Sequence, residues 1–321
     1  MQLIKYTPTS QTVWDQTVKA CRNATFLFLR DFMDYHKDRF QDGSLIFADK
    51  KGNPLGLLPA NLVPEEKWVC SHGGLTYGGL LLLPEVHLID VKEMFQLLAQ
   101  HYLEQGYHHL VYKPTPPIYH SYPCEEDRYW LFRADAQLSA RTASSTIDLT
   151  HPLPFSTLRK RKIKKAAQEH YIYKVDAAWD AYWNILEEVL ASRHQTHAVH
   201  RLEEMLRLKR AFPDAIRLHT LHDKQDACIA GCVCFDCFPT LHVQYIAAAE
   251  QGRDNGALDL LFQELIQHYS HTGHRYFDFG ISTEEQGRKL NEGLNFQKEG
   301  FGSRTICYDT YSVDLEKLVN L

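Results

Sequence analysis

The sequence is poor in several features that would assign a protein to a class at once. Its formal net charge is −5, so no overall basic field drives non-specific binding to nucleic acids. The longest apolar runs, such as GLLLLP at 79–84, fall far short of the roughly 18 residues that a membrane-spanning helix needs. The first residues, MQLIKYTPTSQ, lack the cationic start and apolar core of a secretory signal. We therefore expect a soluble, cytoplasmic protein without membrane insertion.

Common catalytic and metal-binding motifs are also missing. The sequence holds no G-x-S-x-G elbow, no Walker loop and no H-E-x-x-H frame. Its C-x-x-C pair, Cys234 and Cys237, has no second pair at zinc-site spacing. Histidines recur at three-residue spacing in two places outside such a frame: His194, His197 and His200, and His268, His271 and His274. We expect no metal site.

Cysteine is present but arranged in a way that disfavours disulfides. Four of the eight cysteines lie within ten residues, CIAGCVCFDC at 228–237, that read as one strand. Neighbours along a strand are poor disulfide partners, so we expect buried, reduced thiols.

Length and composition favour two globular domains. The chain has 321 residues, 44% hydrophobic and 23% charged, which is enough for two cores. Pro152 and Pro154 interrupt regular structure after LSARTASSTIDLT. We therefore expect an N-terminal domain at 1–145 and a C-terminal domain at 146–321.

The two halves show one order of elements. In the second half, apolar spacing predicts helices over 177–194 and 201–212, three strands within 215–249, a helix over 256–273 and a strand over 275–280. The first half repeats the later part with strands within 44–62 and 68–79, a helix over 90–106 and a strand over 108–113. Aligning GYHHLVYKP with GHRYFDFGI gives an offset of 167 residues between the two halves, and aligning His72 with His242 gives an offset of 170. This pattern predicts two three-layer α/β domains with mixed, mostly antiparallel sheets.

The repeated order resembles the GNAT acyltransferase superfamily in its tandem form. FSTLRKRKIKKAAQEHYIYKV at 155–175 resembles the start of the second domain of the Fem-type peptidoglycan-bridge aminoacyltransferases. ALDLLFQELI, YFDFGIS and LNEGLNFQKEGFGSR resemble the closing part of Fem-like bacterial acetyltransferases. The resemblance implies an enzyme that moves an acetyl or similar group from acyl-CoA to an amine of a cell-envelope or nucleotide-linked precursor.

Two departures keep alternatives open. The long helical hairpin with which Fem-type ligases help hold tRNA has no counterpart in a charged heptad segment here. The coenzyme A loop of the superfamily reads Arg or Gln, two residues, Gly, one residue, and Gly or Ala. Arg253 and Gly256 match it and Leu258 does not. Aminoacyl transfer from tRNA and a non-catalytic binding protein of the same fold remain the alternatives.

A glycine-containing turn is the predicted donor site. EQGRDNGALD at 250–259 lies between a strand and a helix, where backbone N–H groups attract anions. Gly252 and Gly256 permit close approach of a pyrophosphate, and we assign Arg253 and Asn255 to the same site. The alternative is a plain strand-to-helix turn. The matching turn of the first half has no glycine, so we expect a degenerate, acceptor-side N-terminal domain.

Polar groups of the first half are predicted to bind the acceptor. His72 and Tyr77 lie in CSHGGLTYGG, whose glycines suggest a bulge or a ligand wall. Tyr119 and His120 lie in the proline-rich KPTPPIYHSYPCEED and look exposed. That segment is either an acceptor wall or a stiff connector.

A basic cluster in the second half is the third acceptor element. LRKRKIKK includes Arg159 and Arg161, which suit a phosphorylated acceptor or an RNA backbone. The alternative is a solvated helix face with Ile163 pointing inward.

Acyl transfer requires a base for the amine and a donor for the developing oxyanion. His242 and Tyr245 precede the glycine turn on one strand, and Asp278 lies on the next between two phenylalanines. Asp278 is either a catalytic group or a carboxylate paired in the core.

The last part of the second domain is predicted to form a short helix and a closing hairpin. We expect a short helix over 282–294, with Ser282 or Thr283 as its N-cap, and a closing hairpin over 295–311 that turns at Gly300 and Gly302. Three charged hairpin residues are added to the site, Glu299 as a catalytic group and Lys298 and Arg304 as substrate-binding groups. The alternative is that these charges are solvated, as charges on hairpins usually are.

Overall fold

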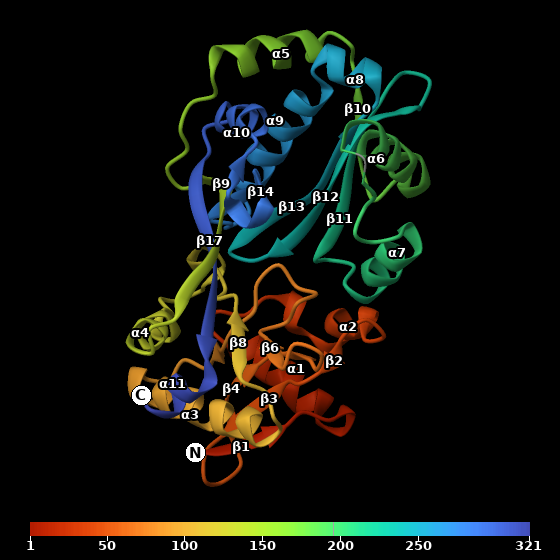
Figure 1. Cartoon of the computed structure of the whole chain (residues 1–321). Coiled ribbons are helices and arrows are strands. Elements are labelled where there is room, and N and C mark those ends of the chain that lie inside the picture. Colours follow the sequence, from red (N-terminus) through yellow and green to blue (C-terminus); the bar gives the residue numbers. More distant parts are fainter. Residues whose placement is uncertain (195) are drawn as a thin grey trace. The chain divides into compact units, whose positions relative to one another are not determined.

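The computed structural model describes residues 1–194 and 196–321, which form two compact units (Figure 1). Unit 1 comprises residues 1–142, 283–289 and 307–321, and unit 2 comprises residues 143–282 and 290–306. We expected two consecutive domains that meet near residue 145. The chain leaves unit 1 after Thr142, returns to it over Thr283–Lys289 and returns again from Cys307. Strands β9 (Gln137–Asp148) and β17 (Arg304–Asp314) therefore contribute residues to both units.

Unit 1 combines short strands with helices on a shared core. One antiparallel sheet has the order β1 (Gln2–Lys5), β3 (Leu45–Ala48), β4 (Pro54–Leu58), β7 (Leu81–Leu82). A second set of hydrogen-bonded strands in this unit has the order β17, β8 (His109–Tyr112), β6 (Trp68–Cys70), β5 (Asn61–Val63), β2 (Gln41–Asp42). The helices are α1 (Gln11–Ala20), α2 (Arg30–Met33), α3 (Leu88–Glu104), α4 (Glu126–Arg133) and α11 (Leu315–Val319).

Helix α3 supplies much of the core of unit 1. Val91, Met94, Phe95 and Leu98 recur at helical spacing and are fully buried. They belong to one apolar cluster with residues of β3, β4, β8 and α11. The C-terminal helix is therefore part of this unit's core although it ends the chain.

In unit 2 the strand order is β10 (Ile172–Val175), β11 (Ile216–His222), β12 (Cys228–Cys237), β13 (Thr240–Ala248), β14 (Tyr276–Ile281), β9. Neighbours are antiparallel except β13 and β14, which run parallel. The helices are α5 (Thr157–Ala167), α6 (Trp179–His194), α7 (Leu202–Ala211), α8 (Glu250–Asn255), α9 (Ala257–Tyr269) and α10 (Glu292–Glu299).

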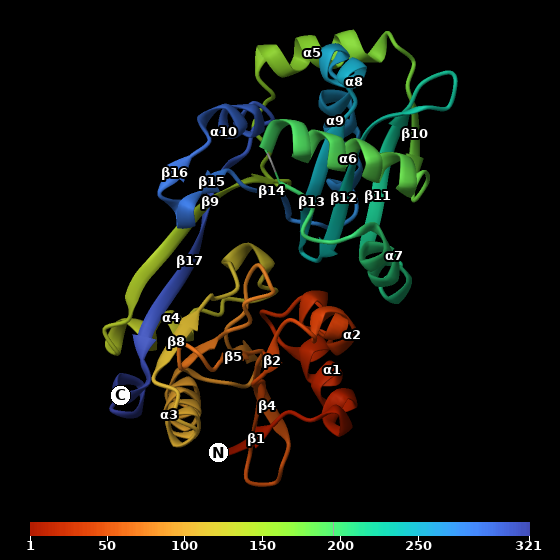
Figure 2. The same cartoon turned by 45° about the vertical axis from the view of Figure 1, so that its right-hand side comes forward.

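Helices cover both faces of the strands of unit 2. Helix α9 packs on β11, β12 and β13 from one side, and α6 packs on β12 and β13 from the other (Figure 1). The turned view shows α6 lying across these strands (Figure 2). Strand β12 is buried along nearly its whole length, in agreement with its continuous apolar run and its mostly buried, reduced cysteines. Gly231 faces α6, where an added Cβ would lie 2.7 Å from the ring of Tyr182.

The parallel pair β13 and β14 separates soon after it forms. The strands are in register at Thr240, Leu241 and His242, which oppose Tyr276, Phe277 and Asp278. Strand β13 continues to Ala248, and no further pairing with β14 occurs among residues 1–194 and 196–321. One edge of β13 is therefore open. Unit 1 has a corresponding parallel pair in β6 and β8, so the repeated order seen in the sequence is present in both units.

The predicted helix over 282–294 is wrong. Residues 283–290 form a small hairpin of β15 (Thr283–Glu284) and β16 (Lys289–Leu290), and α10 follows. Gln286 and Gly287 have left-handed φ values of 55° and 91°, which a continuous helix cannot accommodate. Asn291 is the N-cap instead, since its side chain accepts a hydrogen bond of 3.0 Å from the N–H of Leu294. The predicted hairpin over 295–311 is thus the end of α10, a short turn and β17.

Two further findings concern membranes and metals. No helix in the described part of the chain is both long and apolar enough to cross a membrane. Within the same residues, no group of three His, Cys, Asp or Glu side chains could hold a metal ion; the side chain of His194 lies outside those described.

Candidate functional site

A cavity of about 340 Å³ lies at the open edge of β13 in unit 2. We call it the N-end cavity because the first residues of α9 line it. Its walls come from Ile246–Ala248 at the end of β13, the α8–α9 junction, Phe279 of β14, and the last turns of α10. It brings together four of the predicted site residues, namely Gly252, Arg253, Gly256 and Lys298.

The predicted glycine turn is a short helix followed by a kink. Helix α8 ends at Asn255, its C-cap Gly256 has a left-handed φ of +79°, and α9 begins at the next residue. An added Cβ at Gly256 would lie 2.9 Å from the carbonyl oxygen of Lys162, so α5 packs directly on the junction. Arg253 donates from Nη1 to the carbonyl of Ala248 at 3.0 Å, and Asn255 is half-buried outside the cavity lining. Only glycine fits the junction without strain.

Cationic groups dominate the charged lining of the N-end cavity. Lys162, Arg253 and Lys298 face it, and the acidic group among its lining residues is Asp259. Asp259 is neutralised by Arg159, whose Nη1 lies 2.6 Å from its carboxylate while both side chains are buried. Burial raises the pKa of Asp259, and the charges of Arg159 and Lys162 oppose that rise. The cavity thus suits an anionic group.

Lys298 is the most deeply buried of these cations. Its residue is 5% exposed, and Nζ donates to the carbonyls of Gly280 at 2.9 Å and Ile281 at 2.8 Å. Burial lowers the pKa of its ammonium to about 8, and the nearby Asp278 carboxylate opposes that shift. Its charge state therefore changes close to neutral pH.

His242 and Asp278 form a dyad at the point where β13 and β14 separate. His242 Nδ1 lies 2.8 Å from Oδ2 of Asp278, which is fully buried. Oδ1 of Asp278 accepts hydrogen bonds from Ser144 Oγ at 2.6 Å and Thr146 Oγ1 at 2.8 Å, both on β9. An ionised carboxylate accepts the proton of Nδ1, so Nε2 is the ring nitrogen that carries a lone pair. This arrangement is that of a general base held by a carboxylate.

Gly280 connects the dyad to Lys298. Its φ is +75°, and an added Cβ would lie 3.3 Å from Cε1 of His242. Its carbonyl oxygen accepts the hydrogen bond from Lys298. A base and a cation therefore both lie at Gly280, the residue after Phe279 of the cavity wall, although His242 and Asp278 do not line the cavity themselves. They are the pair of groups that acyl transfer needs.

Other predicted residues of unit 2 lie outside this arrangement. The hydroxyl of Tyr245 is bound to Nδ1 of His200 at 2.7 Å, and its ring packs edge-on against Trp183. Glu299 is half-buried at the end of α10 without lining the cavity. Arg161 is exposed on α5, and Arg304 is exposed with Nη1 on the carbonyl of Ser303. Arg159, predicted to contact a phosphate, is instead buried in the ion pair described above.

The predicted acceptor residues of unit 1 are more buried than expected. Tyr119, expected to be exposed, is 1% exposed, and its hydroxyl is 2.9 Å from that of Tyr308 while its ring lies 4.6 Å from that of Tyr77. The reason is a 3₁₀ turn at Pro117–Tyr119, which folds the proline-rich segment back onto the core. His72 is buried and His120 half-buried, and burial lowers their pKa values to about 3 and about 4.

Sequence reasoning missed several residues that complete the site. Ser144 and Thr146, the partners of Asp278, lie on one face of β9 within a run of three buried polar residues, 144–146, and that run would have been a signal. Lys162 was one of six cations in a run, and only the packing of α5 shows which of them reaches the cavity.

Comparison with known proteins identifies the fold. Residues 156–286 match the family model described as an acetyltransferase (GNAT) domain. No curated protein matches the sequence. The matched segment includes β10 to β14 and the α8–α9 junction, and therefore most of the walls of the N-end cavity.

Solved structures resemble the chain over nearly its full length. The crystal structure of FemX has a TM-score of 0.67 at 10% identity, over 100% of this chain and 99% of that one. L-PGS from Bacillus licheniformis has a TM-score of 0.59 at 11% identity, over 95% and 90%. A tandem GNAT protein from the clavulanic acid biosynthesis pathway has a TM-score of 0.51 at 11% identity, over 98% of each chain. Such low identities establish the fold alone. The chain has the tandem GNAT, Fem-like acetyltransferase fold, and its residues 156–286 match the GNAT domain in sequence as well.

Proposed function

We propose that the protein is an N-acyltransferase that binds its acyl donor in the N-end cavity and transfers the acyl group to an amine. The observation that carries this proposal is the open edge of β13 beside a cavity lined by Lys162, Arg253 and Lys298. An extended donor can hydrogen-bond to the unpaired strand edge while its phosphates meet the cations near Gly256. Acyl-CoA has both features, and it is the donor that we assign.

The dyad and Lys298 account for the chemistry. Nε2 of His242 takes a proton from the acceptor amine, and Asp278 stabilises the imidazolium that forms. The amine nitrogen attacks the thioester carbonyl carbon, and the ammonium of Lys298 stabilises the oxyanion. The C–S bond then breaks, the amide forms, and the thiolate leaves as a thiol after taking up a proton. Residues of the open β13 edge hold the donor during these steps.

The acceptor that we infer is an amine of a cell-envelope or nucleotide-linked precursor. The resemblance of residues 155–175 to the Fem-type enzymes supports this class. A phosphate on the acceptor has cations available on α5, where Lys160, Arg161 and Lys164 are exposed.

A second candidate function is favoured by the same helix. The exposed cations of α5 lie on the helix that packs against the α8–α9 junction, where they could meet the backbone of an aminoacyl-tRNA donor. In this version the scissile bond is an ester, and the roles of His242 and Lys298 are unchanged. A non-catalytic binding protein is the third outcome that the experiment must separate.

Calorimetry with acetyl-CoA, aminoacyl-tRNA and a nucleotide-linked muramyl peptide separates these functions. We expect saturable binding of acetyl-CoA and a loss of at least about tenfold in Arg253→Glu, because a hydrogen bond to a charged group contributes roughly 1.5–3 kcal/mol. Arg304→Glu, an exposed arginine outside the cavity, is the matched control.

Each other outcome rejects part of the proposal. Equal acetyl-CoA affinity in Arg253→Glu and the wild type would remove the donor site from the N-end cavity. Binding of aminoacyl-tRNA without binding of acetyl-CoA would identify aminoacyl-tRNA as the donor in place of acyl-CoA. If acetyl-CoA binds but no free thiol is released in the presence of the muramyl peptide and a panel of amines, the protein is a binding protein and not a transferase.

A further inference from the structure

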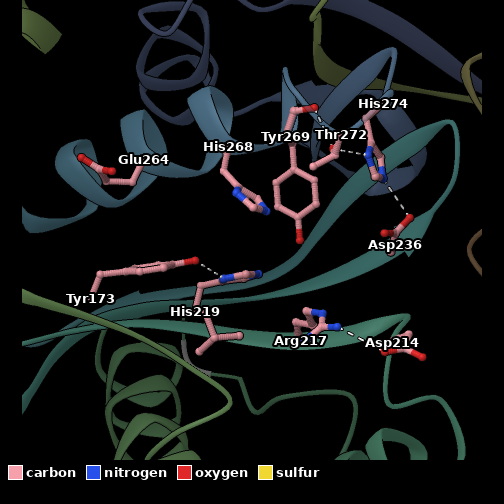
Figure 3. Close-up of a pocket in the computed structure, with 11 residues that line it drawn as sticks. Tyr173, Asp214, Arg217, His219, Asp236, Glu264, His268, Tyr269, Thr272 and His274 are labelled. Carbon is pink, nitrogen blue, oxygen red and sulfur yellow. Dashed lines mark hydrogen bonds and ion pairs between the residues drawn. The ribbon is translucent and has the colours of Figure 1, made fainter.

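A second cavity, of about 500 Å³, lies at the other end of α9 in unit 2. We call it the C-end cavity. Side chains of β10, β11, the end of β12 and the last turns of α9 line it (Figure 3). It shares no lining residue with the N-end cavity, and neither the dyad nor Lys298 faces it. The proposed acyl transfer therefore does not use it.

A buried imidazole forms its inner wall. His219 is 2% exposed, and its Nδ1 lies 2.7 Å from the hydroxyl of Tyr173. Its Nε2 is buried and has no hydrogen-bond partner among the described residues. Figure 3 shows the ring lying below His268 and beside the hydroxyl of Tyr269. Buried polar atoms are nearly always hydrogen-bonded, so this nitrogen marks a position that a ligand atom can fill.

Tyr269 directs a second polar atom into the same space. Its ring is buried and packs edge-on against His219 and His274, with centroids 6.2 and 5.0 Å apart. Its hydroxyl points toward His219 and Arg217 (Figure 3) and forms no hydrogen bond within the described chain. The hydroxyl can therefore donate a hydrogen bond to, or accept one from, a ligand that lies between these two side chains.

Arg217 adds a cation on the same side. It lies two residues before His219 on β11, which places both side chains on one face of the strand. Its Nη2 pairs with Asp214 at 3.2 Å, and the side chain of Asp214 is 96% exposed. Exposed ion pairs are weak, so a ligand can exchange with Asp214. A second contact, 3.5 Å to Asp176, holds Nη1.

We propose that Arg217, the hydroxyl of Tyr269 and Nε2 of His219 bind the carboxylate or phosphate group of a small metabolite. Tyr173 donates its proton to Nδ1 of His219, so the ring presents Nε2–H to the ligand. Burial raises the pKa of the Tyr173 hydroxyl, which therefore keeps the proton that this arrangement requires.

The rest of the cavity limits the remainder of the ligand. The volume exceeds that of a single oxyanion, and Asp236 and Glu264 border it. Asp236 is held by His274, whose Nε2 lies 2.9 Å from its carboxylate. Carboxylates at the border favour amino or hydroxyl groups on the ligand. The class is thus a small, hydrophilic acid that also carries such groups.

The histidines do not indicate a metal. His219, His268 and His274 all line the cavity, but no three metal-binding side chains are suitably grouped among those that the structure describes, which leave out that of His194. Their roles differ: His219 faces the ligand position, and His274 fixes a carboxylate at the border.

Imidazole ¹⁵N NMR of the full chain tests the proposal with inorganic phosphate, acetate and O-phospho-L-serine as probes. We expect at least one probe to shift the signals of His219, which are assigned with His219→Gln, and to raise its pKa from about 4. Phosphate and acetate separate the two kinds of oxyanion. The amine of O-phospho-L-serine tests the acidic border.

Two variants give the decisive comparison. Arg217→Gln and Tyr269→Phe should each weaken the binding of the active probe about tenfold, while acetyl-CoA affinity and the thermal midpoint of Tyr269→Phe stay unchanged. Exposed His271, which follows α9 outside the cavity, supplies the control His271→Gln. Unmoved His219 signals with all three probes, or equal affinity in Arg217→Gln and the wild type, would overturn the proposal.

Discussion

The two ends of α9 carry cavities of different construction. The N-end cavity depends on backbone: an open strand edge, a left-handed glycine and the cations around it. The C-end cavity depends on side chains from four separate segments that meet on one sheet face. The part of the N-end cavity formed by the turn at 252–259 leaves a local sequence signature, whereas positions that meet from distant segments leave none.

The cavities also differ in the pH at which their charge changes. Lys298 has a pKa lowered to about 8, so the N-end cavity loses positive charge on the alkaline side of neutrality. His219 has a pKa lowered to about 4, so the C-end cavity gains positive charge only in acid. Measurements at different pH can therefore address each cavity separately.

The largest expected effect belongs to the dyad beside the N-end cavity. His242→Ala should lower kcat by about 10²–10⁴-fold, because general-base catalysis contributes that much. Asp278→Asn should approach the same loss, since an amide no longer fixes the tautomer of His242. Steady-state kinetics measure both changes.

Tyr245→Phe is the control for that prediction, because Tyr245 lies on the same strand but is bound to His200. Its kcat should stay within a few fold of the wild type. A wild-type rate in His242→Ala would show that the imidazole takes no part in the reaction. Binding of the probes in the C-end cavity should be unchanged in all of these variants.

Lys298→Met should lower kcat by about 10²–10³-fold, as the loss of an oxyanion donor does. In the wild type the rate should decline as pH rises above about 8, because the ammonium loses its proton there. The variant should lack that decline. Lys160→Met, which removes an exposed cation of α5, should retain it. An alkaline decline of equal size in Lys298→Met would assign the titration to another group.

Much of the fold could be predicted because its signals are local. The helix α9 and the strands β11, β12 and β13 follow from apolar spacing and polar turns, and their predicted order is confirmed. The hairpin at 283–290 was missed because Ser282 and Thr283 are good N-cap residues. The left-handed backbone of Gln286, which prevents the helix, has no signature in its side chain.

The predicted residues that line the N-end cavity are mostly those that lie close together in the sequence. Gly252, Arg253 and Gly256 lie within five positions and line one cavity as a group. Arg159 was misassigned because a basic run does not show which member faces Asp259, a hundred positions later. The C-end cavity was not predicted at all, since His219 and Tyr269 are fifty residues apart and neither belongs to a motif.

Acid should destabilise the fold through the C-end cavity. The unfolded imidazole of His219 takes up its proton near its ordinary pKa of about 6.5, and the folded one only near 4. Between these values the unfolded state binds more protons, so the free energy of unfolding falls as pH falls, by about 3 kcal/mol in full. Urea denaturation at pH 7, 5.5 and 4 measures this loss.

In His219→Gln the free energy of unfolding should fall less between pH 7 and pH 4, because glutamine does not titrate. The probe that binds the C-end cavity should reduce it in the wild type, since an anion beside Nε2 favours the protonated ring. His72, another buried histidine with a lowered pKa, contributes independently in unit 1 and remains in both proteins. An unaltered pH dependence in His219→Gln would mean that other groups cause it.

The smallest expected effects compare the glycines at the two ends of α9. Gly256 and Gly273 have φ values of +79° and +85°, so alanine at either position costs roughly 1–2 kcal/mol of stability through backbone strain. An added Cβ at Gly256 also meets the carbonyl of Lys162 at 2.9 Å, while at Gly273 the nearest atom is on the ring of Phe238 at 3.9 Å. Gly256→Ala should therefore be less stable than Gly273→Ala. It should also weaken acetyl-CoA binding, because the α8–α9 junction must shift to relieve the contact with Lys162. Thermal unfolding and calorimetry of the pair measure both differences. Equal donor affinity in the two variants would show that the junction does not shape the donor site, and the contrast between the two cavities would lose its structural basis.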